Sequence, residues 1–389
     1  MTDHPPGAPE PAAGLADAVT DHARGNLSRH AGADTGPVES RTAAVSAPAA
    51  SRRLADHTTF RIGGPADQLV VASSEAELIG AVSDADQSGR PLLLLGGGSN
   101  VLVGDAGFRG TVVLVATRGC RWAATSGGVV TVAAGEVWDD FVAQTLLRGY
   151  GALAALSGIP GSVGAAPVQN IGAYGAEVAE TIQSVRAFDR RRGEVTILPA
   201  AECAFGYRTS RFKSEPDRYA IVDVDFFLRP DDAGAPPGHP ELADRLGLAP
   251  GQRPSPLDVR QAVLELRRSK GMLLDPADHD TWSAGSFFTN PLLTGGQAKA
   301  LPPEAPRYPQ PDGTVKTSAA WLIAQAGFAR GHGPGPARLS TKHVLALTNR
   351  GGATAADILA LARTVRDAVS ARFAITLTPE PTLVGCALS

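Results

Sequence analysis

The stretch LLLLGGGSNVLV, residues 92–103, decides how the rest of the chain is read. Its four leucines predict a buried strand, and the apolar residues 101–103 predict a second strand after the glycines. Glycines let backbone N–H groups approach an anion closely, and a run of such groups binds phosphate. A tight turn between two strands explains the segment equally well. The candidate phosphate-binding residues are Gly96, Gly97, Gly98, Ser99 and Asn100.

This turn matches neither of two common nucleotide-binding patterns. It fits neither G-x-G-x-x-G nor G-x-x-x-x-G-K-S/T. The residues after the glycines are apolar and β-branched, whereas a Rossmann turn requires a helix there. The sequence therefore speaks against both a Rossmann fold and a P-loop.

A second glycine-rich segment, GIPGSVGAAPVQNIGAYG, occupies residues 158–175. It has no helical or strand period, yet it contains branched apolar residues that suit a solvated loop poorly. Such a segment usually packs closely against something large or follows a phosphate, so we favour a cofactor cradle over a flexible loop. The candidate cofactor-binding residues here are Gly158, Gly161, Ser162, Gly164, Asn170 and Gly172.

Composition limits the classes of protein to which the chain can belong. Its 389 residues indicate two or three domains, and a net charge of −3 gives no reason to expect nucleic acid as a partner. No apolar run reaches the roughly 18 residues of a membrane-spanning helix, and no secretory signal opens the chain. Three distant cysteines and scattered histidines predict neither disulfide nor metal site. We expect a cytoplasmic protein without membrane insertion.

The order of segments predicts mixed helix and strand. Residues 1–50 are rich in Ala, Gly, Pro and Asp, which predicts a disordered N-terminal extension. Helices are expected to begin after Ser74, Ser255 and Thr354, each of which precedes an apolar stripe at helical spacing. Strands are expected at residues 69–72, 92–95, 101–103, 111–115, 129–134, 185–188, 195–198, 220–228 and 375–378.

Five further blocks carry a resemblance to a known family. They are HTTFRIGGPAD at 57–67, FGYRTSRFK at 205–213, AGSFFTNP at 284–291, AAWLIAQAG at 319–327 and TPEPTLVG at 378–385. Together with the two glycine-rich segments, and in the same order, they resemble the UDP-N-acetylenolpyruvoylglucosamine reductase family, also called UDP-N-acetylmuramate dehydrogenases. The resemblance covers the chain from about residue 54 to its end.

The resemblance implies an α+β fold in several parts. Residues 51–230 would form a two-part FAD-binding domain of the vanillyl-alcohol-oxidase type, with two subdomains. A Pro- and Gly-rich inserted loop is expected at 231–256. Residues 257–389 would form an α/β domain for the UDP-sugar substrate, with the final strand and tail returning to the active site.

The resemblance also implies a reaction of peptidoglycan precursor synthesis. NADPH reduces non-covalently bound FAD, and the enolpyruvyl ether of UDP-N-acetylglucosamine then receives hydride in the same cleft. The implied catalytic residues are Arg208, Ser286 and Glu380. A guanidinium suits the negative charge that develops on the substrate carboxylate, and the serine hydroxyl suits protonation of the adjacent carbon. Glu380 stands between two prolines, which restrict its direction.

Substrate-binding positions follow from the same resemblance. Lys270 matches a lysine that reaches the diphosphate or NADPH, and Asn290 and Gln325 match residues that bind the sugar nucleotide. Tyr207 adjoins Arg208 and either contacts substrate or packs. His239 stands where many members carry a tyrosine that closes over the uridine. We expect a monomer.

Two alternative functions remain open at this point. One is another FAD oxidoreductase of the same superfamily, which would often tether its flavin through His or Cys. Neither glycine-rich segment contains His or Cys. The other is an inactive nucleotide-binding module, against which the joint presence of Arg208, Ser286 and Glu380 argues.

Overall fold

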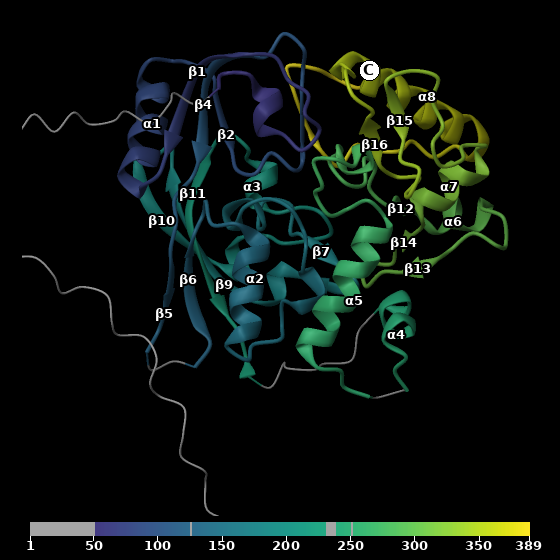
Figure 1. Cartoon of the computed structure of the whole chain (residues 1–389), viewed down its shortest axis with the longest axis horizontal. Coiled ribbons are helices and arrows are strands. Elements are labelled where there is room, and N and C mark those ends of the chain that lie inside the picture. Colours follow the sequence, from purple (N-terminus) through teal and green to yellow (C-terminus); the bar gives the residue numbers. More distant parts are fainter. Residues whose placement is uncertain (1–50, 125–126, 231–238, 250–251) are drawn as a thin grey trace, which may run out of the picture. The chain divides into compact units, whose positions relative to one another are not determined.

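The chain folds as an α+β structure, as the sequence predicts (Figure 1). The computed structural model describes residues 51–124, 127–230, 239–249 and 252–389, so the extension predicted at 1–50 lies outside them. A three-stranded sheet and a five-stranded sheet precede a region of helices and short strands. Among the helices of these ranges, none combines the length and apolar character needed to span a bilayer.

The three-stranded sheet is parallel and holds the strand before the GGGSN turn. Its strands, in spatial order, are β1 (Ala66–Ala72), β4 (Phe108–Val115) and β2 (Leu92–Leu95). Helix α1 (Glu75–Gln87) packs its apolar stripe on this sheet. The Ser74 hydroxyl accepts a hydrogen bond from the N–H of Glu77, which confirms the predicted helix start.

The five-stranded sheet is antiparallel. Its strands, in spatial order, are β10 (Glu194–Pro199), β9 (Ile182–Asp189), β11 (Tyr219–Phe227), β6 (Val129–Ala133) and β5 (Cys120–Trp122). Helix α2 (Trp138–Leu147) packs against it through buried aromatic side chains. Arg186 of β9 pairs with Asp223 of β11 and with Glu75 of α1, so ion pairs join the two sheets.

Short elements lie between the strands of the five-stranded sheet and directly after its last strand along the chain. They are β7 (Gly172–Ala173), β8 (Ala176–Glu177), α3 (Arg211–Ser214) and α4 (Pro240–Leu246). Single 3-10 turns lie at Leu54–His57, Ala154–Leu156, Val163–Ala165, Val178–Glu180, Ala200–Glu202 and His279–Thr281.

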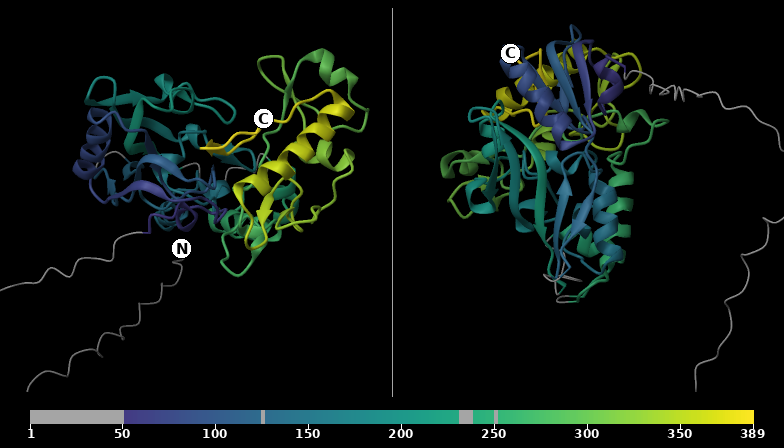
Figure 2. Two further views of the ribbon diagram at one scale, coloured as in Figure 1. Left: turned by 90° about the horizontal axis from the view of Figure 1, so that it is seen from above. Right: turned by 90° about the vertical axis from the view of Figure 1, so that its left-hand side faces the viewer.

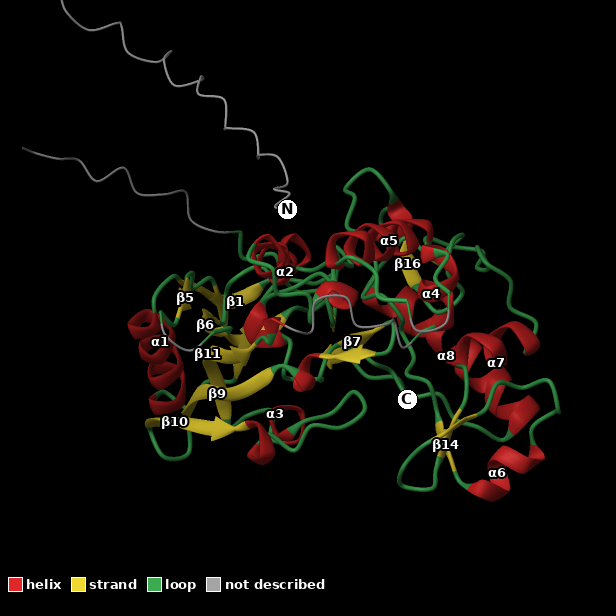
Figure 3. Cartoon of the chain, turned by 90° about the horizontal axis from the view of Figure 1, so that it is seen from below, coloured by secondary structure: helices red, strands yellow, loops and turns green. Residues whose placement is uncertain are grey.

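The C-terminal region follows α4 and consists of helices and short strands, which lie on the right of Figure 3. Its helices are α5 (Pro256–Ser269), α6 (Gly295–Ala300), α7 (Ala319–Gln325) and α8 (Ala355–Phe373). The buried side chains of α6, α7 and α8 form the core of the C-terminal region, whereas those of α5 belong to the core of the five-stranded sheet. Its short strands are β12 (Leu292–Leu293), β13 (Tyr308–Pro309), β14 (Val315–Lys316), β15 (Ala337–Leu339) and β16 (Leu347–Asn349). Ser255 and Thr354 cap α5 and α8, as the sequence predicts.

The last strand returns to the segment after the GGGSN turn. Strand β17 (Thr382–Val384) pairs in parallel with β3 (Val101–Val103), and Figure 2 shows this tail lying beside the N-terminal half. Leu102 in β3 is fully buried in the core of the C-terminal region. The Asp105 carboxylate accepts hydrogen bonds from the first two N–H groups of α8. The β3 segment therefore fixes both the tail and α8.

Two predictions from the sequence are corrected. The strand predicted at 375–378 is wrong, because only one isolated bridge, between Phe288 and Pro379, forms there. Pro379 and Pro381 lack N–H donors, so regular pairing begins only at Thr382, whose N–H donates to the carbonyl of Asn100. The segment predicted as an inserted loop contains helix α4 with proline at its first turn and a left-handed glycine after its end. Residues 231–238 and 250–251 of that segment lie outside the described ranges.

Removing the contact between Asp105 and α8 should lower the stability of the protein by a measurable amount. Asp105→Ala should lower the free energy of unfolding by about 0.5–2 kcal/mol, because two N–H groups at the helix start lose their acceptor. Denaturant unfolding measures this. Asp67→Ala is the control, since it removes only an exposed pair with Arg109 and should change stability by less than about 0.5 kcal/mol. Equal losses in the two variants would contradict the cap.

Candidate active site

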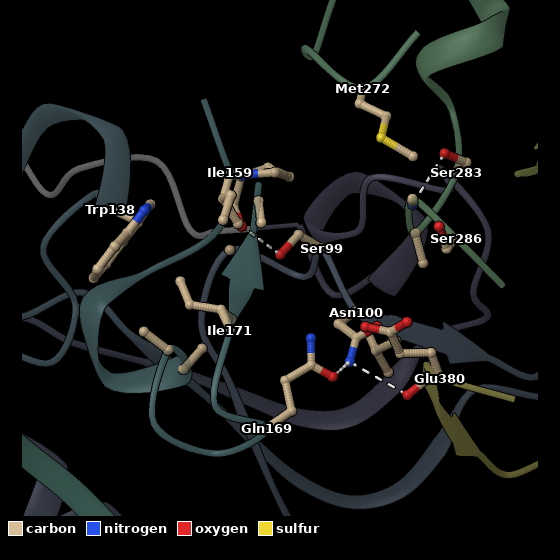
Figure 4. A pocket seen from close by; sticks show the side chains of 18 of the residues that line it. Ser99, Asn100, Trp138, Ile159, Gln169, Ile171, Met272, Ser283, Ser286 and Glu380 are labelled. Atoms are coloured by element: carbon tan, nitrogen blue, oxygen red, sulfur yellow. Dashed lines mark hydrogen bonds between the residues drawn. The ribbon is translucent and has the colours of Figure 1, made fainter. Parts of the chain in front are cut away.

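A cavity of about 450 Å³ brings together segments from the whole described chain. Its walls include the GGGSN turn, part of the second glycine-rich segment, the end of α5 and the residues before β17. Figure 4 shows Asn100, Ser286 and Glu380 grouped on one side and Trp138 on the other. Arg208 also borders the cavity, so all three predicted catalytic residues line it.

The two glycine-rich segments lie backbone against backbone. A Cβ on Gly97 would stand 2.7 Å from the Cα of Gly161, and a Cβ on Gly96 would stand 2.3 Å from the hydroxyl of Ser162. The Ser99 hydroxyl donates to the carbonyl of Pro160 at 2.9 Å. The glycines are thus required first by the close approach of the two loops, which also leaves backbone groups facing the cavity.

A second cavity of about 470 Å³ borders the same glycines. Gly96, Gly97 and Ser162 line both cavities, so the contact between the two loops lies between them. Arg61 and Arg118 also border the second cavity, and neither forms an ion pair within the described ranges. The Arg61 guanidinium lies 4.7 Å from the ring centre of Trp282, another lining residue.

Arg208 and Glu380 form an ion pair inside the first cavity. The Arg208 Nε lies 3.2 Å from the Glu380 Oε1, and the opposite end of the guanidinium donates to the carbonyl of Gly172 at 2.7 Å. Arg208 has a φ of 54°, a left-handed conformation that is unfavourable for arginine, so the surrounding contacts must hold its backbone there. Burial raises the pKa of Glu380, against the opposing effects of Arg208 and Lys213.

Lys213 adds a second cation to this cluster. Its Nζ donates to the carbonyl of Arg208 at 3.0 Å, and burial lowers its pKa. Lys213 belongs to the FGYRTSRFK block, but sequence reasoning did not single it out. Its side chain lies near Glu380 only because α3 folds back after Arg208, which no local pattern reveals.

Ser286 projects from a loop that is fixed at both sides. Gly285 has a φ of 70°, and the two phenylalanines that follow Ser286 are buried. The N–H of Glu380 donates to the carbonyl of Phe287 at 2.8 Å, which sets the glutamate beside this loop. The Thr59 hydroxyl donates to the carbonyl of Ser283 at 2.6 Å. Since the Thr59 N–H donates to the carbonyl of Gly98, one residue links the loop to the glycine turn.

Only two of the five predicted substrate-binding residues line a cavity. Lys270 and His239 line the first cavity, and Tyr174 lies between them, 5.5 Å from the Lys270 Nζ and 5.6 Å from the His239 ring. Gln325 lies exposed at the end of α7 and lines neither cavity.

Tyr207 and Asn290 are both partly buried. Burial raises the pKa of Tyr207, and its ring has Lys316 4.8 Å away and Arg208 5.7 Å away. The Asn290 side-chain oxygen accepts a hydrogen bond from the N–H of Ala319 at the start of α7. Neither residue lines the cavity in this conformation.

Three predicted cofactor residues border neither cavity and have packing roles. Asn170 is buried, and its side chain bonds to Glu177 and to the carbonyl of Gly206. A Cβ on Gly158 would meet Leu273 at 2.5 Å, and one on Gly164 would meet the side chain of Ala134 at the same distance. These residues shape the loop rather than face the cavity.

Other residues of the cavity wall escaped sequence reasoning. Arg267 is buried and donates to the carbonyls of Gly158 and Met272, and burial lowers its pKa to about 10. Burial, with Lys270 and Arg330 nearby, lowers the pKa of His343 to about 4. Only the fold brings these residues together, because they come from segments without a distinctive local pattern.

Comparisons with known proteins agree with this architecture. A family model described as FAD binding domain matches residues 66–198, and one described as UDP-N-acetylenolpyruvoylglucosamine reductase, C-terminal domain, matches residues 275–384. A reductase of that name from Streptomyces coelicolor is 51% identical over 376 residues, covering 94% of this chain and 97% of the relative. One from Cutibacterium acnes is 54% identical over 340 residues, covering 86% and 90%.

A solved structure is also similar. The crystal structure of the UDP-N-acetylenolpyruvylglucosamine reductase from Thermus caldophilus has a TM-score of 0.59 and 26% sequence identity. The match covers 85% of this chain and 97% of that chain. The likeness therefore extends over both the FAD-binding part and the C-terminal region.

The approach of the two glycine loops can be tested at one position. Gly97→Ala should separate the loops and yield protein with little bound flavin, because the new methyl would meet backbone that cannot rotate away. The ratio of flavin to protein absorbance measures loading. Gly80→Ala, in a helix with no neighbour within 4 Å of the added methyl, is the matched control and should load normally. Full loading of the Gly97 variant would mean that the close approach is not needed.

Proposed function

Because the chain belongs to the UDP-N-acetylenolpyruvoylglucosamine reductase family, we propose that it reduces the enolpyruvyl ether of UDP-N-acetylglucosamine to UDP-N-acetylmuramate with NADPH. The observation that carries this proposal is the single cavity bordered by Arg208, Ser286, Glu380 and the GGGSN turn. Bound FAD would accept hydride from NADPH and pass it to the enolpyruvyl group. We place this step of peptidoglycan precursor synthesis in the cytoplasm and assign it to a monomer.

The residues around the two cavities fit a flavin dinucleotide. The glycine contact between them offers backbone groups for a diphosphate, and a Cβ at Gly96 or Gly97 would collide with Ser162 or Gly161 and separate the loops that form this cradle. We assign the flavin ring to the first cavity, beside Ser286, and the ADP half to the second cavity. There Arg61 and Arg118 are cations without a carboxylate partner in the described part of the chain, as expected for residues that meet phosphate.

Arg208 and Glu380 would hold the substrate carboxylate. The carbonyl of Gly172 and the carboxylate of Glu380 orient the guanidinium before any ligand arrives, so little reorganisation is needed. The raised pKa of Glu380 increases its protonated fraction, and a protonated carboxyl can donate a hydrogen bond to the substrate carboxylate. Both groups would stabilise the charge that develops there as hydride adds to the terminal carbon of the double bond.

Ser286 would protonate the carbon that bears the carboxylate. Its loop is fixed by Thr59 and by the backbone of Glu380, so its hydroxyl is held on the same side of the cavity as the carboxylate-binding pair. Phe287 and Phe288, which follow it, are buried in the core of the C-terminal region and anchor the loop. A weak acid in this setting can transfer a proton because its position is fixed.

The role of Ser286 is tested by separating the two half-reactions. Ser286→Ala should bind FAD and be bleached by NADPH at nearly the wild-type rate. Its reoxidation by the enolpyruvyl substrate should slow by about 10²–10⁴-fold, because only this half needs the proton. Stopped-flow absorbance of the flavin follows each half. Ser283→Ala, in the same loop, is the control and should not slow reoxidation selectively. Equal slowing of both halves in the Ser286 variant would reject the proton-donor role.

The placement of the ADP half is tested by comparing two flavins. Arg61→Gln and Arg118→Gln should each weaken FAD binding to apoprotein by about tenfold or more, since a hydrogen bond to a charged group contributes about 1.5–3 kcal/mol. Riboflavin lacks the diphosphate, so its affinity should not change. Flavin fluorescence titration gives both constants. Arg109→Gln, in an exposed pair with Asp67, is the control. Equal losses for FAD and riboflavin would move the diphosphate elsewhere.

A further inference from the structure

An ion pair at the wall of the first cavity links Lys270 to Glu241. The Lys270 Nζ lies 2.6 Å from the Glu241 Oε2, and both residues line the cavity. Their side chains are 27% and 40% exposed, so the pair is open to exchange with other ions. The ammonium group also lies 5.5 Å from the centre of the Tyr174 ring. Lys270 thus carries a carboxylate partner at a place that a ligand can reach.

The charges that line the cavity are unequal. Among the described residues, four basic side chains line it, namely Arg208, Lys213, Arg267 and Lys270, against two carboxylates. Each carboxylate is already paired, Glu380 with Arg208 and Glu241 with Lys270. The pair at Arg208 lies at the proposed reaction centre, whereas the pair at Lys270 lies beside α4. Removing Glu241 from Lys270 would leave a larger excess of positive charge.

Among the described residues near Lys270, no other side chain supplies a negative charge. The neighbouring His343 side chain has a pKa lowered to about 4 by burial and by Lys270, so it is neutral at physiological pH and contributes no negative charge. Tyr174 has a pKa raised to about 12 by burial, so it also stays neutral. Within the described residues, Glu241 is therefore the anion that balances Lys270.

Glu241 belongs to an element with few attachments. Helix α4 packs on α5 through buried Leu242 and through an ion pair between Arg245 and Glu265. The Glu241 carboxylate extends from the first turn of this short helix, where rotation of its side chain suffices to release Lys270. Exchange of partners therefore needs no change in the rest of the cavity wall.

We propose that Glu241 is an internal counter-anion, which occupies Lys270 between ligands and is displaced by the phosphate groups of each ligand that enters. The inference rests on the proposed function, in which NADPH and the UDP-sugar, both polyanions, use this cavity in turn. A built-in competitor lowers the affinity of Lys270 for each of them by the same mechanism. It thereby promotes release of NADP⁺ before the sugar nucleotide enters, and release of the product afterwards.

The test measures anion binding to the oxidised holoenzyme by calorimetry, with pyrophosphate, NADP⁺ and UDP as probes. Glu241→Gln keeps the shape of the side chain and removes its charge. It should bind all three probes about 2–5-fold more tightly, the factor expected for loss of a competing, partly exposed ion pair. Glu265→Gln is the matched control, because it breaks the other α4 ion pair without touching Lys270, and it should leave the affinities unchanged.

A double variant assigns the effect to the pair. In a Lys270→Gln background, Glu241→Gln should no longer change the affinity for pyrophosphate. Weaker or unchanged pyrophosphate binding in the Glu241 single variant would overturn the proposal, as would equal tightening in the Glu265 variant. If Glu241→Gln lowers the melting temperature, Glu241→Ala is judged by the same criteria.

The same binding measurements test the proposed function separately from the counter-anion. Pyrophosphate needs only the cationic wall, so its binding tests the counter-anion alone. If pyrophosphate binds more tightly to Glu241→Gln but neither NADP⁺ nor UDP binds to any form, the counter-anion stands and the proposed pair of ligands falls. If NADP⁺ and UDP bind but Glu241→Gln changes none of the three affinities, the counter-anion proposal is rejected and the proposed pair of ligands stands.

Discussion

Direct contact between the backbones of two glycine-rich loops is the constraint on which the rest of the site depends. A methyl group on Gly97 would stand only 2.7 Å from the Cα of Gly161, so no side chain other than hydrogen is accommodated without movement. The contact joins the parallel sheet, which ends in the first loop, to the part of the chain that carries the antiparallel sheet. It also leaves a cavity on either side. A dinucleotide that spans both cavities would therefore contact the two parts at their junction.

Thr59 extends this constraint to the loop that carries Ser286. Its N–H and hydroxyl reach the GGGSN turn and the carbonyl of Ser283, so the loop that carries Ser286 is positioned relative to the proposed cofactor cradle by two hydrogen bonds. The motif HTTFRIGG thus has a structural explanation that does not require contact with substrate. Proximity of a proton donor to a reacting carbon depends on such supporting bonds as much as on the donor itself.

Local sequence patterns predicted helices and strands well where a single feature, a capping residue or an apolar run, was sufficient. Capping residues located the starts of α1, α5 and α8, and apolar runs located every strand of the two sheets except β5, whose three residues Cys120–Trp122 form no apolar run. The failure at 375–378 has a clear cause. Ile375 and Leu377 alternate with exposed neighbours as in a strand, but they are buried in the core of the C-terminal region without a partner strand.

The site was only partly predictable for a different reason, since its burial and its charges come from distant segments that meet only in the fold. Lys213, Arg267 and His343 show no signal in the sequence that separates them from ordinary polar residues. Conversely, Gln325 matches a family position yet lies exposed on α7, because a match in sequence does not state which way a side chain points.

The position of Glu380 couples completion of the fold to completion of the site. Its N–H donates to the carbonyl of Phe287, and its own carbonyl accepts a hydrogen bond from Asn100 at 3.4 Å. Two residues later, Thr382 donates to the carbonyl of Asn100 and opens the parallel pairing of β17 with β3. The carboxyl group that faces Arg208 is thus held by the last strand of the chain. Since that strand pairs with the segment directly after the GGGSN turn, docking of the C-terminal tail is what brings Glu380 to its position beside that turn and Arg208.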